Sequence, residues 1–286
     1  MSAQAAAPTP QTVWGSLSQA ERDAAYNNNL AVPDSAAWVT ARDEAASAYR
    51  AAHAAHLDVP YGPGARQKLD LYPAADPAAP CLVFIHGGYW QRNSRVLFAA
   101  FAEGAAAAGW SVAMPSHTLA PEASLAAIVT EIGSALDVLK ADGPAHGIAG
   151  PLVVSGWSAG GHLAALHLAH PAVTAGLAIS GVFELGPLRD TFLNTALKLT
   201  DDEIATLSPL RLPVVKKPLA IAYGTAEVPA LVADARALHA LRAGAHAPGP
   251  LVPVVGANHF SILEELRRPG GLLVRTAQAI LGDALA

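Results

Sequence analysis

The chain has 286 residues, of which 52% are hydrophobic and only 14% are charged, so it can bury a large core and is not disordered. Its formal net charge of −5 offers no basic surface for nucleic acid or acidic lipid. The single cysteine, Cys81, excludes an intramolecular disulfide and a cysteine-based zinc site. Neither a signal peptide nor a membrane span is visible in the sequence, which predicts a cytoplasmic protein.

The first part of the chain predicts a loose tail over residues 1–12, followed by a helical arm. The helical pattern extends over 17–53 and breaks near Pro33. Ser18, followed three residues later by Glu21, fits a capping box at the start of the first helix. Either residue of the Asp-Ser pair at 34–35 could cap the second helix.

A hairpin is expected next, because residues 57–61 and 67–72 alternate around a Gly/Pro turn. Pro60 cannot donate a hydrogen bond to a central ladder, so it places the first of these strands at a sheet edge. The proline-rich spacer 73–80 then separates the hairpin from the rest of the chain.

Beyond the spacer, apolar strands alternate with helices. The expected strands are 81–85, 110–114, 152–155, 177–180, 219–223 and 251–255. The expected helices are 96–108, 124–140, 161–170, 229–242, 260–266 and 271–281. This alternation predicts a mostly parallel sheet covered on both faces, with functional groups beyond the carboxyl ends of its strands.

The first chemical signal is the sequence Gly-Trp-Ser-Ala-Gly at 156–160, between a predicted strand and a predicted helix. A sharp strand–turn–helix junction of this kind lifts a serine oxygen above the sheet, while the small neighbours let strand and helix approach. The start of the helix also directs its positive end at that oxygen. We therefore predict Ser158 as a nucleophile; without partners, the same motif would be only a glycine-rich turn.

A serine needs a base, and in this arrangement the base follows the last strand. Of the eleven histidines, His259 lies four residues beyond strand 251–255, in a loop that can reach over the sheet. The other candidates lie before that strand, within a helix or ahead of the sheet: His246, His239, His53 and His56. We assign the base to His259, whose alternative role is to cap the following helix.

The acid that orients the base should follow strand 219–223. Glu227 is the first carboxylate there, and a glutamate can hold a histidine tautomer as an aspartate does. Asp234 comes seven residues later within a predicted helix, and two further aspartates precede the strand, at 201 and 202. Glu227 could also be an ordinary solvated residue at a helix start, and Asp234 is the alternative acid.

An oxyanion needs backbone donors, and the sequence His-Gly-Gly-Tyr-Trp at 86–90 follows the strand that supplies them. Glycine permits the backbone angles that direct N–H groups inward. We expect the amides of Gly88, Tyr89 and Ala159 to form an oxyanion hole. His86 and Gly87 are expected to brace this loop. The alternative is a phosphate-binding glycine loop, which the sequence does not favour because no GxGxxG or Walker lysine pattern lies nearby.

These motifs resemble those of the kynurenine formamidase (arylformamidase) branch of the α/β-hydrolase superfamily, which is related to esterases whose loop reads HGGG. The resemblance lies in residues 86–90 and in Gly-Trp-Ser-Ala-Gly-Gly-His-Leu at 156–163. Further similar stretches are 22–28, 180–188 and 258–260, so it covers most of 17–286.

The resemblance implies an α/β-hydrolase fold, with a mostly parallel central sheet flanked by helices on both faces. It also implies a Ser–acid–His triad on Ser158, Glu227 and His259, without a metal or cofactor. The chain departs from eukaryotic members, which carry Asp in a His-Asp-Ser-Pro-like stretch, because its residues 226–229 read Ala-Glu-Val-Pro.

We expect one domain over 1–286, in which residues 1–56 form the tail and helical arm. The segment at about 183–210 is too long for a simple connection, so we predict a small cap with a helix around 190–198. Aromatic residues near the predicted site suit a planar substrate, and we assign substrate binding to Trp90, Trp157 and Phe183. His162 is expected behind the nucleophile in a supporting role.

The sequence thus predicts a metal-independent serine hydrolase that cleaves N-formyl-L-kynurenine or a related aryl formamide. One alternative is a carboxylesterase for short-chain or aryl esters, and another is an inactive binding protein of the same fold. The expected partner is a small-molecule substrate, with neither nucleic acid nor membrane. A homodimer is the oligomer that we would test first.

Overall fold

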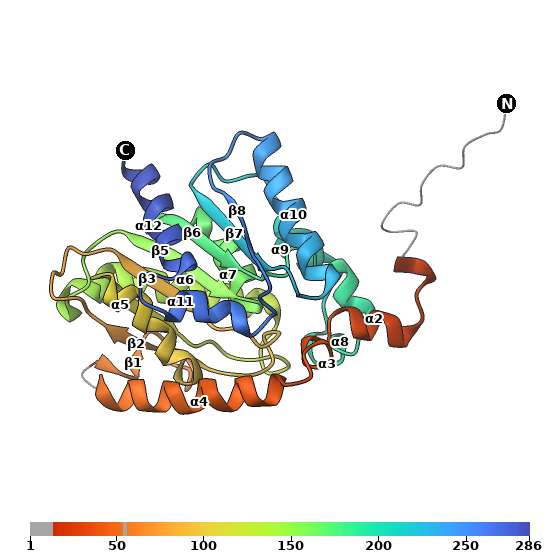
Figure 1. The fold of residues 1–286 in the computed structure, drawn as a ribbon, viewed down its shortest axis with the longest axis horizontal. Coiled ribbons are helices and arrows are strands. Elements are labelled where there is room, and N and C mark those ends of the chain that lie inside the picture. Colours follow the sequence, from red (N-terminus) through yellow and green to blue (C-terminus); the bar gives the residue numbers. More distant parts are fainter. Residues whose placement is uncertain (1–13, 54–55) are drawn as a thin grey trace.

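The computed structural model describes residues 14–53 and 56–286, so the predicted tail at 1–12 lies outside the described residues. An eight-stranded sheet lies at the centre of the described chain, with helices on both of its faces (Figure 1). Its strands, in chain order, are β1 (Val59–Pro60), β2 (Lys68–Tyr72), β3 (Cys81–Ile85), β4 (Ser111–Pro115), β5 (Leu152–Trp157), β6 (Val173–Ile179), β7 (Leu219–Gly224) and β8 (Leu251–Val254).

The sheet has the order β1-β2-β4-β3-β5-β6-β7-β8. The pairs β1–β2 and β2–β4 are antiparallel, and the six strands β4-β3-β5-β6-β7-β8 run parallel to one another. The predicted hairpin and the edge position of Pro60 are therefore confirmed, as is the mostly parallel sheet. The carboxyl ends of β5, β6, β7 and β8 consequently lie along one edge, where ligand sites of such sheets form.

The helices are α2 (Gln19–Ala25), α3 (Asn28–Ala31), α4 (Ser35–Ala52), α5 (Glu103–Ala107), α6 (Leu125–Asp142), α7 (Ala159–Leu166), α8 (Asn194–Leu197), α9 (Asp201–Leu207), α10 (Pro229–Gly244), α11 (Glu264–Arg267) and α12 (Leu272–Leu285). Short 3₁₀ helices are η2 (Arg95–Ala102), η3 (Gly143–His146), η4 (His167–Ala169), η5 (Gly186–Asp190), η6 (Pro209–Arg211) and η7 (Ser261–Leu263). Within the described ranges, none of the helices has the length and apolarity needed to cross a bilayer.

Two hydrophobic layers sandwich the sheet, because successive side chains of a strand point to opposite faces. In β3, Val83 and Ile85 join the layer covered by α6, α7 and α10, whereas Leu82 and Phe84 join the layer covered by α5, α11 and α12. All five residues of β3 are buried, which explains why the strand is a continuous apolar run. The loop at 86–90 therefore begins from a strand that is buried on both faces.

Several of the predicted helices are built differently. The stretch predicted as a helix over 96–108 begins as the 3₁₀ helix η2 and becomes α-helical only at α5. The helix predicted around 190–198 is shorter than expected, because only α8 at 194–197 is α-helical there and η5 is a separate turn that ends at Asp190. Thr191 is extended between them, and Lys198 ends α8 in the left-handed conformation with a φ of 51°. These short turns gain little from helix propagation, so the packing around them decides their conformation.

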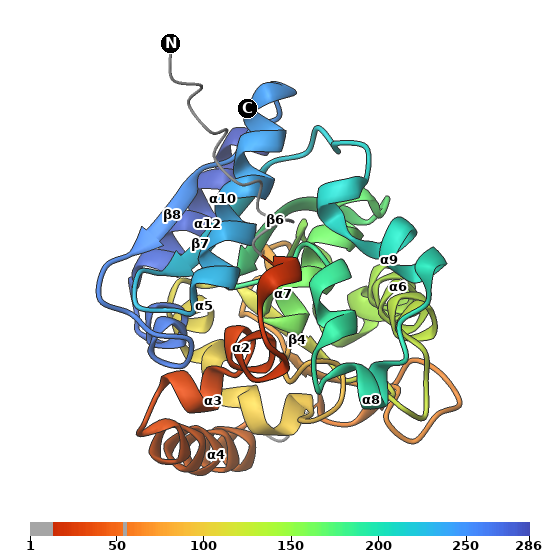
Figure 2. The same ribbon diagram turned by 90° about the vertical axis from the view of Figure 1, so that its right-hand side faces the viewer.

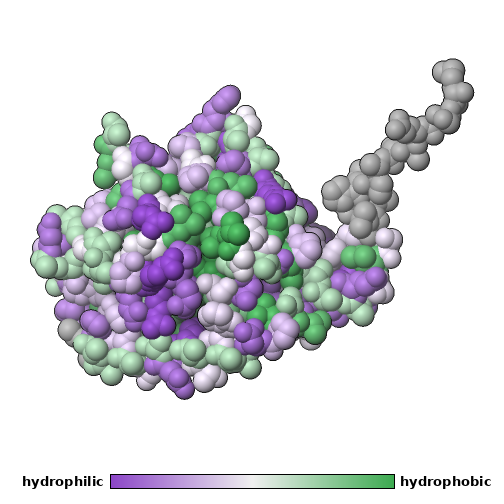
Figure 3. Space-filling view, in the orientation of Figure 1, coloured by the Kyte–Doolittle hydropathy of each residue, from purple (hydrophilic) through white to green (hydrophobic). Residues whose placement is uncertain are grey.

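The N-terminal arm begins with the predicted capping box, which the structure confirms at Ser18 and Glu21. Its long helix α4 follows the lower edge of the molecule, and its outer side mixes pale and hydrophilic residues in Figure 3. Arg50 of this helix donates a 2.8 Å hydrogen bond to the fully buried carboxylate of Asp70 on β2. Arg95 of η2 binds the same carboxylate at 2.8 Å. Because Asp70 is shared, α4 and η2 are tied together over the sheet.

The segment 183–210 contacts the beginning of the arm, and Figure 2 shows α2 in front of the sheet near α8. The indole N–H of Trp14 donates to Asp190 at 3.1 Å, and the amide of Phe192 donates to Asp23 at 2.7 Å. Two stretches that are far apart in sequence therefore cover the same end of the molecule.

Candidate active site

Ser158 lies at a sharp turn between β5 and α7 and is only 2% exposed. Its φ of 58° and ψ of −120° are unusual for a residue other than glycine and lift it out of the strand direction. Glycines make the turn possible, since a Cβ at Gly160 would lie 2.0 Å from the carbonyl oxygen of Ile85. The small residues of the motif therefore let α7 start directly against the central strands.

Glu227 and His259 come from two neighbouring strands and meet at the same edge of the sheet. Glu227 follows β7 and His259 follows β8, and their Oε2 and Nδ1 atoms are 3.1 Å apart. Both side chains are buried. A carboxylate at Nδ1 holds the imidazole in the tautomer whose Nε2 is free to accept a proton.

The other oxygen of the Glu227 carboxylate has two donors. Oε1 accepts the amide of Gly224 at 2.8 Å and the hydroxyl of Ser180 at 2.5 Å. Ser180 belongs to the stretch that carries the family resemblance, but the sequence did not indicate a role for it. Only the packing of β6 beside β7 reveals its contact with the acid.

Ser158 and His259 line one cavity of about 250 Å³. In the described part of the chain, neither the hydroxyl of Ser158 nor Nε2 of His259 has a hydrogen-bond partner. In proteins without a bound substrate, catalytic hydrogen bonds are often long and tighten only when substrate binds. The two groups are thus free to act on a molecule in this cavity.

The indole ring of Trp157 packs against the imidazole of His259. Its indole N–H donates a 2.8 Å hydrogen bond to the backbone carbonyl of His259. The centroids of the indole and imidazole rings are 4.6 Å apart. Phe260 packs against the same indole at 6.1 Å. The residue that precedes the serine therefore holds the loop that carries the histidine.

The loop after β3 contains three successive residues with a positive φ. Gly88, Tyr89 and Trp90 have φ values of 123°, 50° and 57°. The amides of Gly88, Tyr89 and Ala159 donate no hydrogen bond to any residue that the structure describes. Ala159 is also the first residue of α7, where the amides have no partners within the helix and the dipole favours negative charge.

His86 supports this loop from inside the core. Its Nδ1 lies 3.0 Å from the carbonyl oxygen of Gly87, so the nitrogen must donate, and its ring stacks on His117 at 4.8 Å. Burial lowers the pKa of His86 well below its usual range, so the ring stays neutral. Asn93 donates to the same carbonyl of Gly87 at 3.1 Å. The loop is thus held from two sides.

The arm reaches the same loop through the Tyr89 side chain. The phenol donates to the carbonyl of Tyr26 at 2.6 Å and accepts from the amide group of Asn28 at 3.2 Å. Asn28 is only 6% exposed and lines the cavity. The arm therefore forms part of the cavity wall.

The predicted substrate-binding aromatics occupy different places. Trp157 lines the cavity, but Trp90 and Phe183 do not, and they are 1% and 0% exposed. Trp90 packs edge-on against His162, whose Nε2 donates to the carbonyl of Leu207 at 2.7 Å. The aromatic wall is completed instead by Phe192 and Phe260, among other residues.

Asp234, the alternative acid, binds the backbone after β6 instead of His259. Its carboxylate accepts the amides of Phe183 and Glu184 at 2.7 and 3.1 Å, and it does not touch His259. Burial raises its pKa to about 7. Asp234 therefore anchors the chain that leaves β6.

Polar and cationic side chains form part of the cavity wall. Four asparagines (27, 28, 29 and 93) and two arginines, Arg42 and Arg92, line it, with no carboxylate among its described lining residues. Arg42 is paired with Asp43 at 2.7 Å, whereas the guanidinium of Arg92 has neither an ion pair nor a hydrogen bond within residues 14–53 and 56–286. No sequence pattern marks these arginines, because the arm and the β3 loop meet only in the folded chain.

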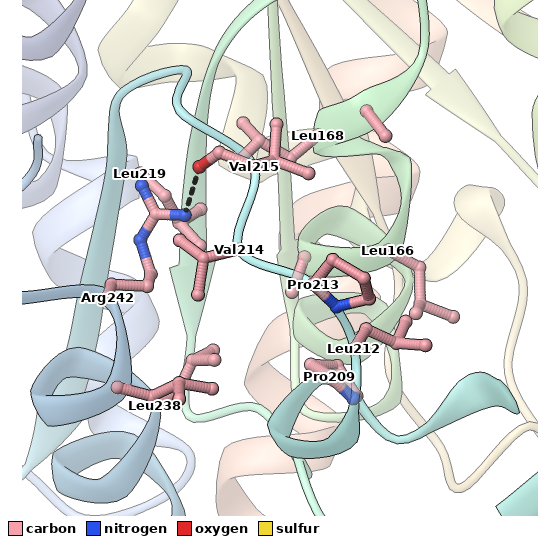
Figure 4. Close-up of a pocket in the computed structure, with 13 residues that line it drawn as sticks. Leu166, Leu168, Pro209, Leu212, Pro213, Val214, Val215, Leu219, Leu238 and Arg242 are labelled. Carbon is pink, nitrogen blue, oxygen red and sulfur yellow. Dashed lines mark hydrogen bonds between the residues drawn. The ribbon is translucent and has the colours of Figure 1, made fainter. Parts of the chain in front are cut away.

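A separate cavity of about 320 Å³ lies between α7, the segment 209–215 and α10 (Figure 4). Its wall is mostly apolar, and Arg242 turns toward the backbone, donating to the carbonyl of Val215 at 3.0 Å. None of the predicted site residues lines it.

Comparisons with known proteins agree with this architecture. The BD-FAE family model matches residues 69–175. The kynurenine formamidase of Danio rerio is 25% identical, over 95% of this chain and 99% of that protein. The kynurenine formamidase of Salmo salar is 30% identical over 61% of this chain and 62% of that protein.

Solved structures share the fold. A candidate thioesterase from Silicibacter sp. superimposes with a TM-score of 0.79 at 30% identity, covering 90% of this chain and 99% of its own. Esterase B from Lactobacillus rhamnosis superimposes with a TM-score of 0.68 at 19% identity, covering 92% of this chain and 97% of its own. The chain is therefore a hydrolase with the α/β-hydrolase fold, and it resembles the kynurenine formamidases.

Proposed function

We propose that the protein is a serine hydrolase that cleaves N-formyl-L-kynurenine, or a related aryl formamide, to the amine and formate. The observation that carries the proposal is the 3.1 Å contact between Nδ1 of His259 and Oε2 of Glu227, beside a cavity that also contains Ser158. In this proposal Ser158 is the nucleophile, His259 the base and Glu227 the orienting acid. The full-length similarity to a kynurenine formamidase supports the formamide substrate.

In the proposed reaction, the hydroxyl oxygen of Ser158 attacks the formyl carbon while Nε2 of His259 takes its proton. The negative charge that develops on the formyl oxygen is stabilised by the amides of Gly88, Tyr89 and Ala159. The carbon–nitrogen bond then breaks, and the imidazolium returns the proton to the leaving amine. A water molecule attacks the formyl-serine by the same route and releases formate.

The positive charge on the cavity wall supports a substrate that has a negatively charged group. Arg92 lines the wall without an ion-pair partner among the described residues, so negative charge is favoured beside it. N-formyl-L-kynurenine has a carboxylate on the side of the leaving amine. Because the formyl group is small, the aromatic leaving group would contact Trp157 and Phe260.

A second candidate is an esterase or thioesterase with the same catalytic residues. The similarity to a candidate thioesterase at 30% identity favours it, because acyl transfer from sulfur or oxygen would use the same steps. A third reading, an inactive binding protein, has no observation in its favour. Location in the cytoplasm and assembly as a homodimer stay predictions from the sequence.

Two measurements test these alternatives. Labelling by a fluorophosphonate should occur at Ser158, and folded protein that stays unlabelled would contradict both enzyme proposals. Turnover of N-formyl-L-kynurenine should then exceed turnover of p-nitrophenyl acetate in kcat/KM. Cleavage of the ester alone would replace the formamidase proposal by the esterase one.

A further inference from the structure

The carboxylate of Glu227 is held at both oxygens, and each oxygen has its own partners. Oε2 faces the imidazole of His259, whereas Oε1 accepts from Gly224 and Ser180. The 2.5 Å contact from the Ser180 hydroxyl is shorter than the 2.8 Å contact from the Gly224 amide. This distance lies within the range of a hydrogen bond from a hydroxyl to a carboxyl oxygen.

Ser180 is placed for this contact by its own backbone. It follows β6 with a φ of 50°, in the left-handed region that residues other than glycine rarely adopt. Its amide donates to the carbonyl of Ala222 on β7 at 2.8 Å, and the residue is fully buried. The position is therefore fixed by the sheet itself, and the hydroxyl has Glu227 as its partner.

A glutamate needs such a contact more than an aspartate does. Its side chain has one more rotatable bond, so without a second anchor the carboxylate could turn away from the imidazole. The donors at Oε1 fix the plane of the carboxylate, and the fixed plane directs Oε2 at Nδ1 of His259. An orienting acid contributes only while this geometry holds.

We propose that Ser180 is a positioning residue of the active site, which holds the carboxylate of Glu227 in the orientation that serves His259. The proposal rests on the proposed function, because it assumes that Glu227 orients the base. Ser180 touches neither substrate nor reacting atoms and acts through Glu227 alone. Its hydroxyl keeps its proton throughout the reaction.

The experiment compares four variants: Ser180→Ala, Glu227→Gln, the double variant and Ser155→Ala. Ser155 is the matched control, because it is also a fully buried serine, on β5, but its hydroxyl has no partner in the described chain. The first readout is the rate of fluorophosphonate labelling at Ser158, which needs no knowledge of the substrate. The second is kcat and KM with whichever of N-formyl-L-kynurenine and p-nitrophenyl acetate is turned over.

We expect Ser180→Ala to lower the labelling rate and kcat by roughly 10- to 100-fold, the range of one hydrogen bond to a charged group. KM should stay the same, and Ser155→Ala should match the unaltered protein. In the Glu227→Gln background, the Ser180 substitution should cause little further loss, because both changes remove the same interaction. If Ser180→Ala does not fold, Ser180→Gly removes the same hydroxyl and tolerates the φ of 50°.

Three results would overturn the proposal. Equal rates for Ser180→Ala and Ser155→Ala would show that the hydroxyl has no role in catalysis. Losses that multiply in the double variant would show that Ser180 does not act through Glu227. Normal labelling in Glu227→Gln would instead remove Glu227 from the proposed triad, and Ser180 would lose its role with it.

Discussion

The indole N–H of Trp157 donates a 2.8 Å hydrogen bond to the backbone carbonyl of His259, and so joins the end of β5 to the loop after β8. The neighbour of the serine thereby positions the histidine. We expect Trp157→Phe, which keeps an aromatic ring but loses this bond, to lower kcat about 10-fold. Steady-state kinetics check this, and an unchanged kcat would show that ring packing alone positions the loop.

Ser158 is the residue on which the proposed chemistry depends most directly. Its replacement by alanine should reduce turnover by roughly 10⁴-fold or more, because the other groups cannot supply a nucleophile. The fold should survive, since the serine hydroxyl has no partner among the described residues. Circular dichroism and thermal unfolding provide the control, and a folded variant with substantial turnover would disprove the assignment.

The link between the arm and the oxyanion loop can be tested at Tyr89. Tyr89→Phe removes the hydrogen bonds to Tyr26 and Asn28 while the ring remains. If these bonds hold the Tyr89 amide in place, kcat should fall about 10-fold, less than the loss of a whole oxyanion donor. Equal kcat values for both proteins would show that the loop keeps its shape without the arm.

A substitution of Arg92 tests whether the substrate has a negatively charged group that binds in the cavity. Arg92→Ala should raise KM for N-formyl-L-kynurenine roughly five- to tenfold, about 1 kcal/mol for a partly exposed ion pair, and added salt should shrink the difference. KM for formanilide, which lacks the carboxylate, should not change. Arg275→Ala, which alters an exposed arginine on α12 outside the cavity, is the control. Equal effects on both substrates would argue against an anion-binding role.

The buried carboxyl of Asp234 should make the free energy of unfolding depend on pH. Burial raises its pKa to about 7 in the folded state, above the ordinary value of 3.8, so the folded protein binds the proton more tightly than the unfolded chain. This group stabilises the fold fully below pH 4, and the contribution is lost as the pH rises through 7. The steepest slope for one proton is about 1.4 kcal/mol per pH unit.

The measurement for Asp234 is the free energy of unfolding in denaturant at pH 4.5, 6 and 7.5, compared between the unaltered protein and Asp234→Asn. Stability relative to the variant should fall as the pH rises, because asparagine does not titrate. A difference that stays constant across this range would show that the carboxyl does not change its protonation on folding.

Much of the fold follows from local patterns in the sequence. Continuous apolar runs such as 81–85 identify strands buried on both faces, and Ser18 with Glu21 identifies a helix start. These signals are local, since they depend on side-chain alternation and on hydrogen bonds within one turn. The conformation of 190–198 could not be predicted in this way. Its short turns have few hydrogen bonds of their own, so the segments packed around them decide how they fold.

The sequence alone determined which residue types could perform the chemistry and in which order they follow the strands: Ser158, then Glu227, then His259. Only the tertiary structure decided what surrounds them. It placed Ser180 against Glu227, brought Arg92 and the arm to one cavity, and buried Trp90 and Phe183 in the core. The physical reason is that the local sequence around a residue largely determines whether it lies in a helix, a strand or a turn. Its contacts with other side chains depend instead on how elements that are distant in the sequence pack together.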